Sequence, residues 1–228
     1  MTRPRAARSL VLAASLAWAP VAVSHPADPL PALDFEPAPP GSYVLHRIMR
    51  APDGEVLGVD GRARRLSEFT RERITLLGFI YTTCVDPNGC PLAYRVFDAL
   101  GPAIVAVPAL RDRVRFVTLS FDPARDSPTV MGRYAGSRLR HEAGGLPWYF
   151  LTTRSARELM PLVEGFGQDV RYSVDRSSGL PRRELSHVLK VFLIDCAGFV
   201  REIYSSNFLH PQIVLNDIET LQQEAAGR

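Results

Sequence analysis

Two cysteines, Cys84 and Cys90, are separated by five residues. The run 74–81 before them is short, apolar and rich in β-branched and aromatic residues, a pattern that predicts a buried strand. Between the cysteines, residues 86–89 read Asp-Pro-Asn-Gly, which is strong turn composition. Pro91 is a favourable first residue for a helix. The pattern therefore places one thiol after a strand and the other at the start of a helix.

This arrangement suits redox or soft-metal chemistry. The positive end of a helix dipole favours thiolate over thiol, so Cys90 is predicted to be the more acidic of the two cysteines. The alternative is a structural disulfide that only stabilises the loop, but such a bond has no need of a helix N-terminus. The sequence therefore favours a reactive pair over a structural one.

The elements that must position these thiols alternate along the chain. Hydrophobic periodicity and turn residues predict strands, then helices, then a closing hairpin and helix, which indicates one α/β domain with three layers around a mixed sheet. A Ser127-Pro128 pair marks a helix start. The predicted strands are 43–48, 55–59, 63–66, 74–81, 114–121, 148–151, 168–174, 185–195 and 199–204. The predicted helices are 67–69, from 91 with a break near Gly101-Pro102, 128–139, 155–163 and 211–224.

The N-terminus has the composition of an export signal. Arg3, Arg5 and Arg8 precede an apolar segment, and small residues at Ala22 and Ser24 form a signal-peptidase pattern. We therefore predict a signal peptide over 1–24, a proline-rich tether over 25–42 that stays out of the core, and a globular domain over 43–228. The alternative is that the segment is retained as an N-terminal membrane anchor. Export implies a periplasmic location and an oxidising compartment, where two nearby thiols can rest as a disulfide.

Composition excludes some partners. The formal charge of +3 comes entirely from the three leader arginines, because residues 1–24 contain no acid. A neutral mature domain has no general electrostatic attraction for nucleic acid, so none is expected as a partner. A hydrophobic content of 46% is ordinary for a globular domain.

Three motifs together resemble the SCO/SenC family over roughly residues 43–221. They are Gly78-Phe-Ile-Tyr-Thr-Thr-Cys84 with Cys90-Pro91, Ser120-Phe-Asp122-Pro123-Ala-Arg125-Asp126-Ser-Pro128, and His187-Val-Leu-Lys-Val-Phe-Leu-Ile-Asp195. The resemblance implies a thioredoxin-like fold with an extra β-hairpin. It also implies a copper site formed by Cys84, Cys90 and His187, and a role in assembling cytochrome c oxidase. Thiolates select Cu(I) and imidazole also accepts Cu(II). Structural zinc would want a fourth protein ligand, and none is evident in the sequence.

The chain departs from the family in two places. The family loop is C-x-x-x-C, whereas this chain has a C-x5-C loop, which adds weight to thiol chemistry over copper delivery. Val188 stands where the family often has a polar residue, so the orientation of the His187 ring must come from elsewhere. Without the family match, His187 would be read as a core histidine.

Other candidate residues have simpler interpretations. Turn and capping roles explain Asp126, while Asp122 is left open between a turn role and a site role. Cys196 is expected to be a bystander in a hairpin turn.

Two functions from different classes follow. The first is a periplasmic copper metallochaperone that binds copper and passes it to an apo-cuproprotein such as an oxidase subunit. The second is a thiol–disulfide oxidoreductase in which Cys84 and Cys90 reduce the cysteines of such a partner, so whether the chain is an enzyme stays open. A thiol peroxidase would need an activating arginine near a nucleophilic cysteine, and the sequence does not place one.

Overall fold

The computed structural model describes residues 30, 32–139, 145–175 and 182–227. Among these residues the main sheet has eight strands in the order β1-β10-β9-β4-β5-β6-β2-β3. The strand β4 is parallel to β5, and β5 to β6, while the other neighbours are antiparallel. The strands are β1 (Met49–Arg50), β2 (Glu55–Gly58), β3 (Ala63–Arg65), β4 (Ile74–Ile80), β5 (Val114–Ser120), β6 (Trp148–Thr152), β9 (Val191–Ile194) and β10 (Phe199–Tyr204).

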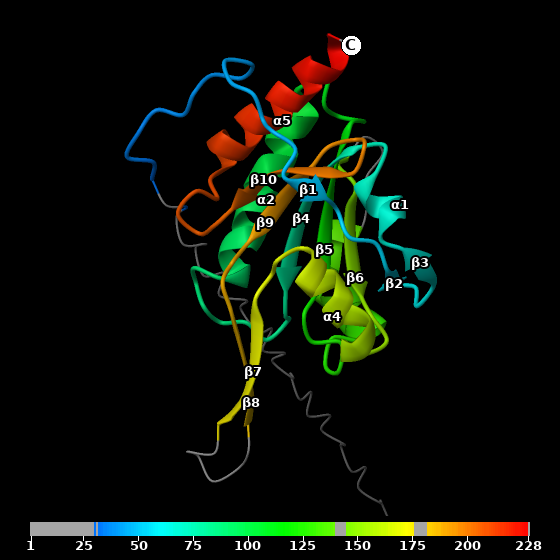
Figure 1. The fold of residues 1–228 in the computed structure, drawn as a ribbon. Helices are drawn as coiled ribbons and strands as arrows, with labels where there is room; N and C mark the ends of the chain where they lie inside the picture. Colours follow the sequence, from blue (N-terminus) through cyan, green and yellow to red (C-terminus); the bar gives the residue numbers. More distant parts are fainter. Residues whose placement is uncertain (1–29, 31, 140–144, 176–181, 228) are drawn as a thin grey trace, which may run out of the picture.

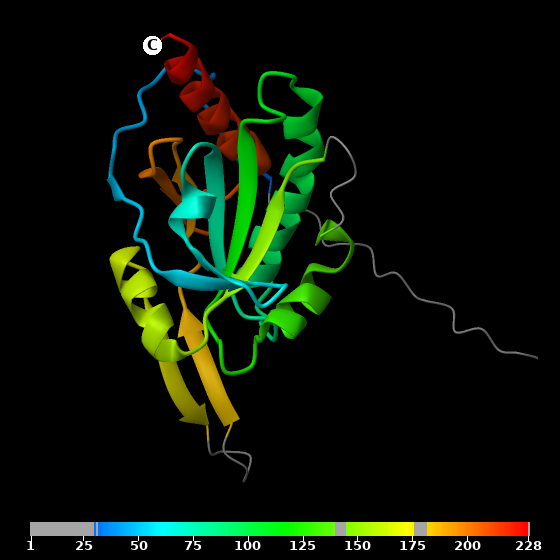
Figure 2. The same cartoon turned by 90° about the vertical axis from the view of Figure 1, so that its right-hand side faces the viewer.

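Helices cover both faces of this sheet, which makes the three layers expected for the domain (Figures 1 and 2). One face carries α2 and α5, and the other carries α1 and α4. A separate hairpin, β7 paired with β8, projects from the body. The remaining elements are α1 (Ser67–Thr70), α2 (Cys90–Ala106), α3 (Pro128–Ala135), a 3-10 turn η1 (Gly136–Leu139), α4 (Ala156–Gly165), β7 (Val170–Asp175), β8 (Arg182–His187) and α5 (Pro211–Ala226).

The buried central strands separate two hydrophobic clusters. Along β4, Ile74, Leu76 and Ile80 pack in one cluster, and the alternate residues Leu77 and Phe79 pack in the other. This alternation is the pleat of a strand whose two faces are both covered. The strand that ends at the cysteine loop is therefore held from both sides. The prediction of a mixed three-layer α/β domain is confirmed.

Three sequence predictions about elements are wrong. The predicted strand 185–195 is two strands in different sheets, because the chain leaves the small hairpin after His187 and enters the main sheet at Val191. The helix from Cys90 continues through Pro102, which removes only one backbone hydrogen bond. Residues 43–48 form no strand, since the pairing with β10 begins at Met49.

The predicted tether, 25–42, lies partly among the described residues and follows α5. The Asn216 side chain donates to the Ala38 carbonyl at 2.8 Å, and Gly41 N donates to Thr220 at 2.9 Å. Leu30 packs against the core cluster that includes residues of α2 and α5, so the expectation that this stretch stays clear of the core is wrong at that residue. The predicted signal peptide, 1–24, lies outside the described residues. Within the described part of the chain, no helix is both long enough and apolar enough to cross a membrane.

A buried arginine ties the end of the chain to the hairpin of β9 and β10. Arg201 is 6% exposed. Its guanidinium pairs with Asp195 at 3.0 Å and with Glu224 of α5 at 2.8 Å, and it donates to the Leu45 carbonyl at 2.9 Å. A buried carboxylate that loses such a partner is strongly destabilising.

Replacing Arg201 with methionine, which keeps much of the side-chain length, is expected to lower the free energy of unfolding by about 3 kcal/mol, because Asp195 would stay buried without its cation. Urea unfolding followed by circular dichroism measures this change. The control is Arg65→Met, which breaks the exposed pair with Asp53 and should cost less than about 1 kcal/mol. Equal losses in the two variants would contradict the role given to Arg201.

Candidate metal and thiol centre

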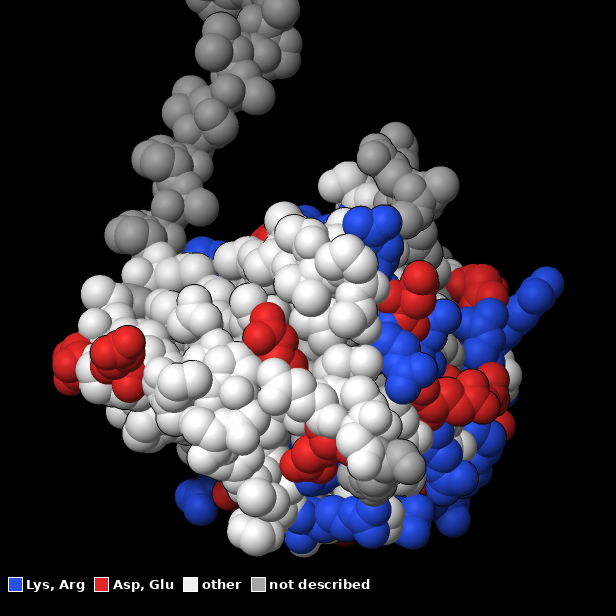
Figure 3. Space-filling view, turned by 90° about the horizontal axis from the view of Figure 1, so that it is seen from above, with Lys and Arg blue, Asp and Glu red and all other residues white. Residues whose placement is uncertain are grey.

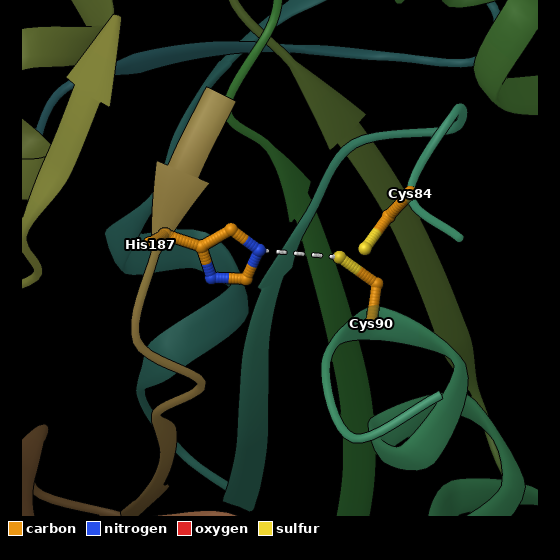
Figure 4. A group of neighbouring side chains, drawn as sticks. All are labelled: Cys84, Cys90 and His187. Atoms are coloured by element: carbon orange, nitrogen blue, oxygen red, sulfur yellow. Dashed lines mark hydrogen bonds between the residues drawn. The ribbon is translucent and has the colours of Figure 1, made fainter. Parts of the chain in front are cut away.

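The cysteine loop is built by local turns between β4 and α2. After β4 ends at Ile80, the Asp86 side chain accepts a hydrogen bond from Asn88 N at 3.0 Å, and its carbonyl accepts one from Gly89 N at 3.0 Å. The chain then enters α2 directly at Cys90. Because these turns fold the five residues between the cysteines back on themselves, the two sulfur atoms lie beside each other (Figure 4).

Asp126, in the segment between β5 and α3, fixes the end of β4. Its carboxylate is 1% exposed and accepts hydrogen bonds from Thr82 N at 3.1 Å, from the Thr82 hydroxyl at 2.5 Å and from the Ser120 hydroxyl at 2.5 Å. Thr82 lies two residues before Cys84, so this carboxylate sets where the loop begins. Asp126 therefore has a structural role, as the sequence indicated, but its hydrogen bonds with Thr82 reach the segment that follows β4 rather than closing a local turn.

Asp122 begins the turn that follows β5. It is 1% exposed and lies 3.7 Å from the Arg125 guanidinium, and its carbonyl accepts the turn hydrogen bonds of Arg125 and Asp126. Among the described residues, the cluster able to hold a metal ion includes Cys84, Cys90 and His187 but not Asp122. The backbone of Asp122 thus forms the turn, and its side chain is not one of the three residues of the cluster.

His187 approaches the thiols from the β7–β8 hairpin. It is the last residue of β8, and its Nε2 lies 3.6 Å from the Cys90 Sγ (Figure 4). The ligand atoms of Cys84, Cys90 and His187 all lie within 4.8 Å of one another. The structure thus brings together the three residues singled out from the sequence, although Cys90 and His187 are 97 residues apart.

Packing orients the imidazole. The His187 ring lies against Phe121, with centroids 4.8 Å apart, and meets Tyr81 edge-on at 5.7 Å. Its Nδ1 is buried and has no hydrogen-bond partner among the described residues. Val188, the next residue, is 58% exposed and offers no polar side chain. The ring is therefore held by its aromatic neighbours and by the position of its backbone.

The segment that follows His187 is hydrogen-bonded to the residues just after α4. The Gln168 side chain is buried and donates to the Val188 carbonyl at 2.8 Å, while Lys190 Nζ donates to the Gly167 carbonyl at 2.6 Å. Gly167 has a φ of 62°, which a glycine adopts without strain. Sequence reasoning missed both Gln168 and Lys190. They act on backbone carbonyls about 20 residues away, and no local motif signals such a contact.

The two thiols differ in exposure and in acidity. Cys84 is half-buried, and hydrogen bonds from Cys90 and then from His187 hold its pKa well below the usual range, against the opposing effect of burial. Cys90 is 1% exposed, and its pKa is raised by its hydrogen bond to Cys84 and by burial. The prediction that Cys90 is the more acidic thiol is wrong, because these two effects outweigh the helix N-terminus.

The donor set fits a soft metal ion. Bonds of about 2.0–2.3 Å to two sulfurs and one nitrogen need ligand atoms roughly 3.5–4 Å apart, so only small side-chain shifts are required from the present spacing. Two thiolates and one imidazole suit copper in either oxidation state. All three cysteines are free thiols, and Cys196 lies apart in the turn between β9 and β10. The centre can therefore support metal binding or thiol exchange.

Comparisons with known proteins agree with this geometry. A model of the SCO1/SenC family matches residues 55–223. A search of curated proteins finds no match. Among solved structures, the copper-bound ScoI of Arabidopsis thaliana has 17% identity and a TM-score of 0.63, covering 76% of this chain and 98% of that one.

Two further structures have the same fold. The apo Sco1 protein of Thermus thermophilus has 26% identity and a TM-score of 0.57, covering 79% of this chain and 95% of its own. BsSco, described with a disulfide switch and as a member of the Sco family of cytochrome c oxidase assembly proteins, has 19% identity and a TM-score of 0.59, covering 79% and 98%. With its thioredoxin-like fold and a family model matched over most of its length, this chain belongs to the SCO1/SenC family.

Proposed function

We propose that this protein is a copper metallochaperone that receives copper at Cys84, Cys90 and His187 and transfers it to an apo-cuproprotein, such as a subunit of a respiratory oxidase. The observation that carries the proposal is the convergence of two sulfurs and Nε2 within 4.8 Å. The copper-bound Arabidopsis relative and the oxidase-assembly description of BsSco support the choice of metal and of partner.

The unequal exposure of the ligands suits transfer. Cys84 is half-buried, and hydrogen bonds hold its pKa low, so an incoming ion or a partner's ligand contacts it first. Cys90 is buried and provides the second sulfur from the inner side of the site. Three protein ligands leave a coordination position open to the partner. Ligand exchange then proceeds by the partner's side chain entering as Cys84 leaves. The leader composition of Arg3, Arg5 and Arg8 followed by an apolar segment supports a periplasmic location.

A second candidate, a thiol–disulfide reductase, is favoured by the low pKa of Cys84. The Cys84 thiolate attacks a partner disulfide, forming a mixed disulfide and releasing one partner thiolate. Cys90 loses its proton, attacks Cys84 Sγ and releases the second partner thiolate. The partner gains two electrons, this protein keeps a Cys84–Cys90 disulfide, and an external dithiol reductant must restore it.

The copper proposal is tested by titrating the reduced protein with Cu(I) and Cu(II) against a competing chelator. His187→Ala should weaken Cu(II) binding by at least about 100-fold, since even residues behind the ligands contribute 10- to 100-fold, and should affect Cu(I) less because both thiolates remain. His46→Ala removes an exposed imidazole outside the centre and should bind as wild type does. Unchanged Cu(II) affinity in His187→Ala would refute the three-ligand site.

The acidity of Cys84 predicts a pH profile. A pKa far below the usual range means that Cys84 is a thiolate throughout pH 5–8, so its alkylation by iodoacetamide should be independent of pH in that window. In Cys90→Ala the main hydrogen-bond donor is lost and the rate should rise with pH. Cys90→Ser keeps a hydroxyl donor and should stay nearly flat. Peptide mass spectrometry of the copper-free, reduced protein measures each profile, and a wild-type rate that rises with pH would contradict the assignment.

A further inference from the structure

A concave site lies away from the thiols, between residues 35–45, β10 and α5. It is a groove of about 440 Å³, within the range of small-molecule pockets. Exposed apolar side chains surround it: Phe35 is 47% exposed, Val44 68% and Phe208 56%. Large exposed apolar side chains clustered at one opening mark a candidate binding surface, because a ligand that covers them removes apolar area from water.

The floor of the groove is preformed. Asp217 is 5% exposed, and its two carboxylate oxygens accept hydrogen bonds from the Tyr43 hydroxyl at 2.5 Å and the Tyr204 hydroxyl at 2.6 Å. These bonds join the N-terminal segment, β10 and α5 at one point. The groove therefore has defined walls before any ligand arrives.

A β-bulge in β10 directs the charged side chain of Glu202 into the wall of the groove. The register of β10 against β9 shifts between Val200 and Glu202, which makes Arg201 the extra residue. Arg201 enters the buried ion pairs with Asp195 and Glu224, whereas Glu202 lines the groove. Bulges of this kind redirect side chains beside functional sites.

Glu202 faces a groove whose described lining holds no cationic side chain. One of its oxygens accepts a hydrogen bond from Ile203 N at 2.8 Å, and among the described residues no Lys or Arg lines the groove. Burial raises the pKa of this carboxyl, and Asp217 raises it further. Figure 3 shows that Lys and Arg gather on the right of that view, while the left side, toward residues 32–45 and α5, is mostly uncharged. A positive group entering the groove would offset the cost of this carboxylate.

We propose that this groove binds a small organic cation, an amine or amidine on an aromatic or alkyl body, with the charge at Glu202 and the body against the apolar walls. The site is distinct from the thiol centre and does not depend on the proposed copper function. Its elements are the N-terminal segment, β10 and α5, whereas the thiol centre is built from β4, α2 and β8.

The test compares three probes of one shape: 4-phenylbutylamine, 4-phenylbutan-1-ol and 4-phenylbutanoate. Each is titrated into the full protein while amide NMR shifts are followed. The amine should bind saturably and at least about tenfold more tightly than the alcohol, and the acid more weakly than the alcohol. Shifts should centre on Tyr43, Glu202 and Asp217.

Glu202→Gln should remove the preference for the amine, because the amide oxygen can still accept from Ile203 N while the charge is gone. Glu164→Gln, an exposed change on α4 over the other face of the sheet, should keep it. Equal affinity for the three probes, an unchanged preference in Glu202→Gln, shifts centred on Cys84, Cys90 or His187, or no saturable binding would each overturn the proposal.

Discussion

The buried Asp126 carboxylate fixes the point at which β4 ends, and the rest of the centre depends on that point. It receives hydrogen bonds from both the backbone and the hydroxyl of Thr82, and it also joins Ser120 of β5. A buried carboxylate must be fully hydrogen-bonded to be tolerated, so it constrains its partners as much as they stabilise it. Because Cys84 follows two residues later, the position of its sulfur is set by the sheet rather than by the loop.

A second constraint acts on the histidine. Within the part of the chain that the structure describes, no hydrogen bond to Nδ1 orients the imidazole, so its direction follows from Phe121, Tyr81 and the backbone at the end of β8. The brace from Gln168 and Lys190 fixes that backbone to α4, whose inner face is buried against the sheet. The thiols and the imidazole are thus carried by separate parts of the fold, each anchored to the same sheet. Such an arrangement can hold three ligands close without making the hairpin part of the core.

The same sheet also positions a buried charge and an accessible charge on β10, the strand next to the edge strand β1. Around the bulge in β10, Arg201 is directed into a buried network with Asp195 and Glu224, while Glu202 is left on a groove wall. One extra residue in a strand separates a structural charge from an accessible one. The thiol centre and the groove therefore depend on one framework but use different elements of it.

The sequence by itself determined the elements whose signals are contiguous. The apolar run before Cys84, the Ser127-Pro128 cap and the turn ending at Gly198 each depend on neighbouring residues, and each is found in the structure. The pairing of Cys84 and Cys90 across one loop follows in the same way. His187 was linked to them only through a family resemblance, because nothing in its local sequence distinguishes a ligand from a core histidine.

Tertiary structure decided the rest. The break between β8 and β9 lies inside an apolar stretch, and it exists because the two halves pair with different partners. The acidity of the thiols depends on which sulfur is buried and which accepts hydrogen bonds. Although Cys84 and Cys90 are close in sequence, the burial of Cys90 and the hydrogen bond from His187 to Cys84 involve parts of the chain that only the fold brings together. The bond from Thr82 to Asp126 spans 44 residues for the same reason. Local periodicity carries no information about such contacts, since they are fixed only when the layers pack together.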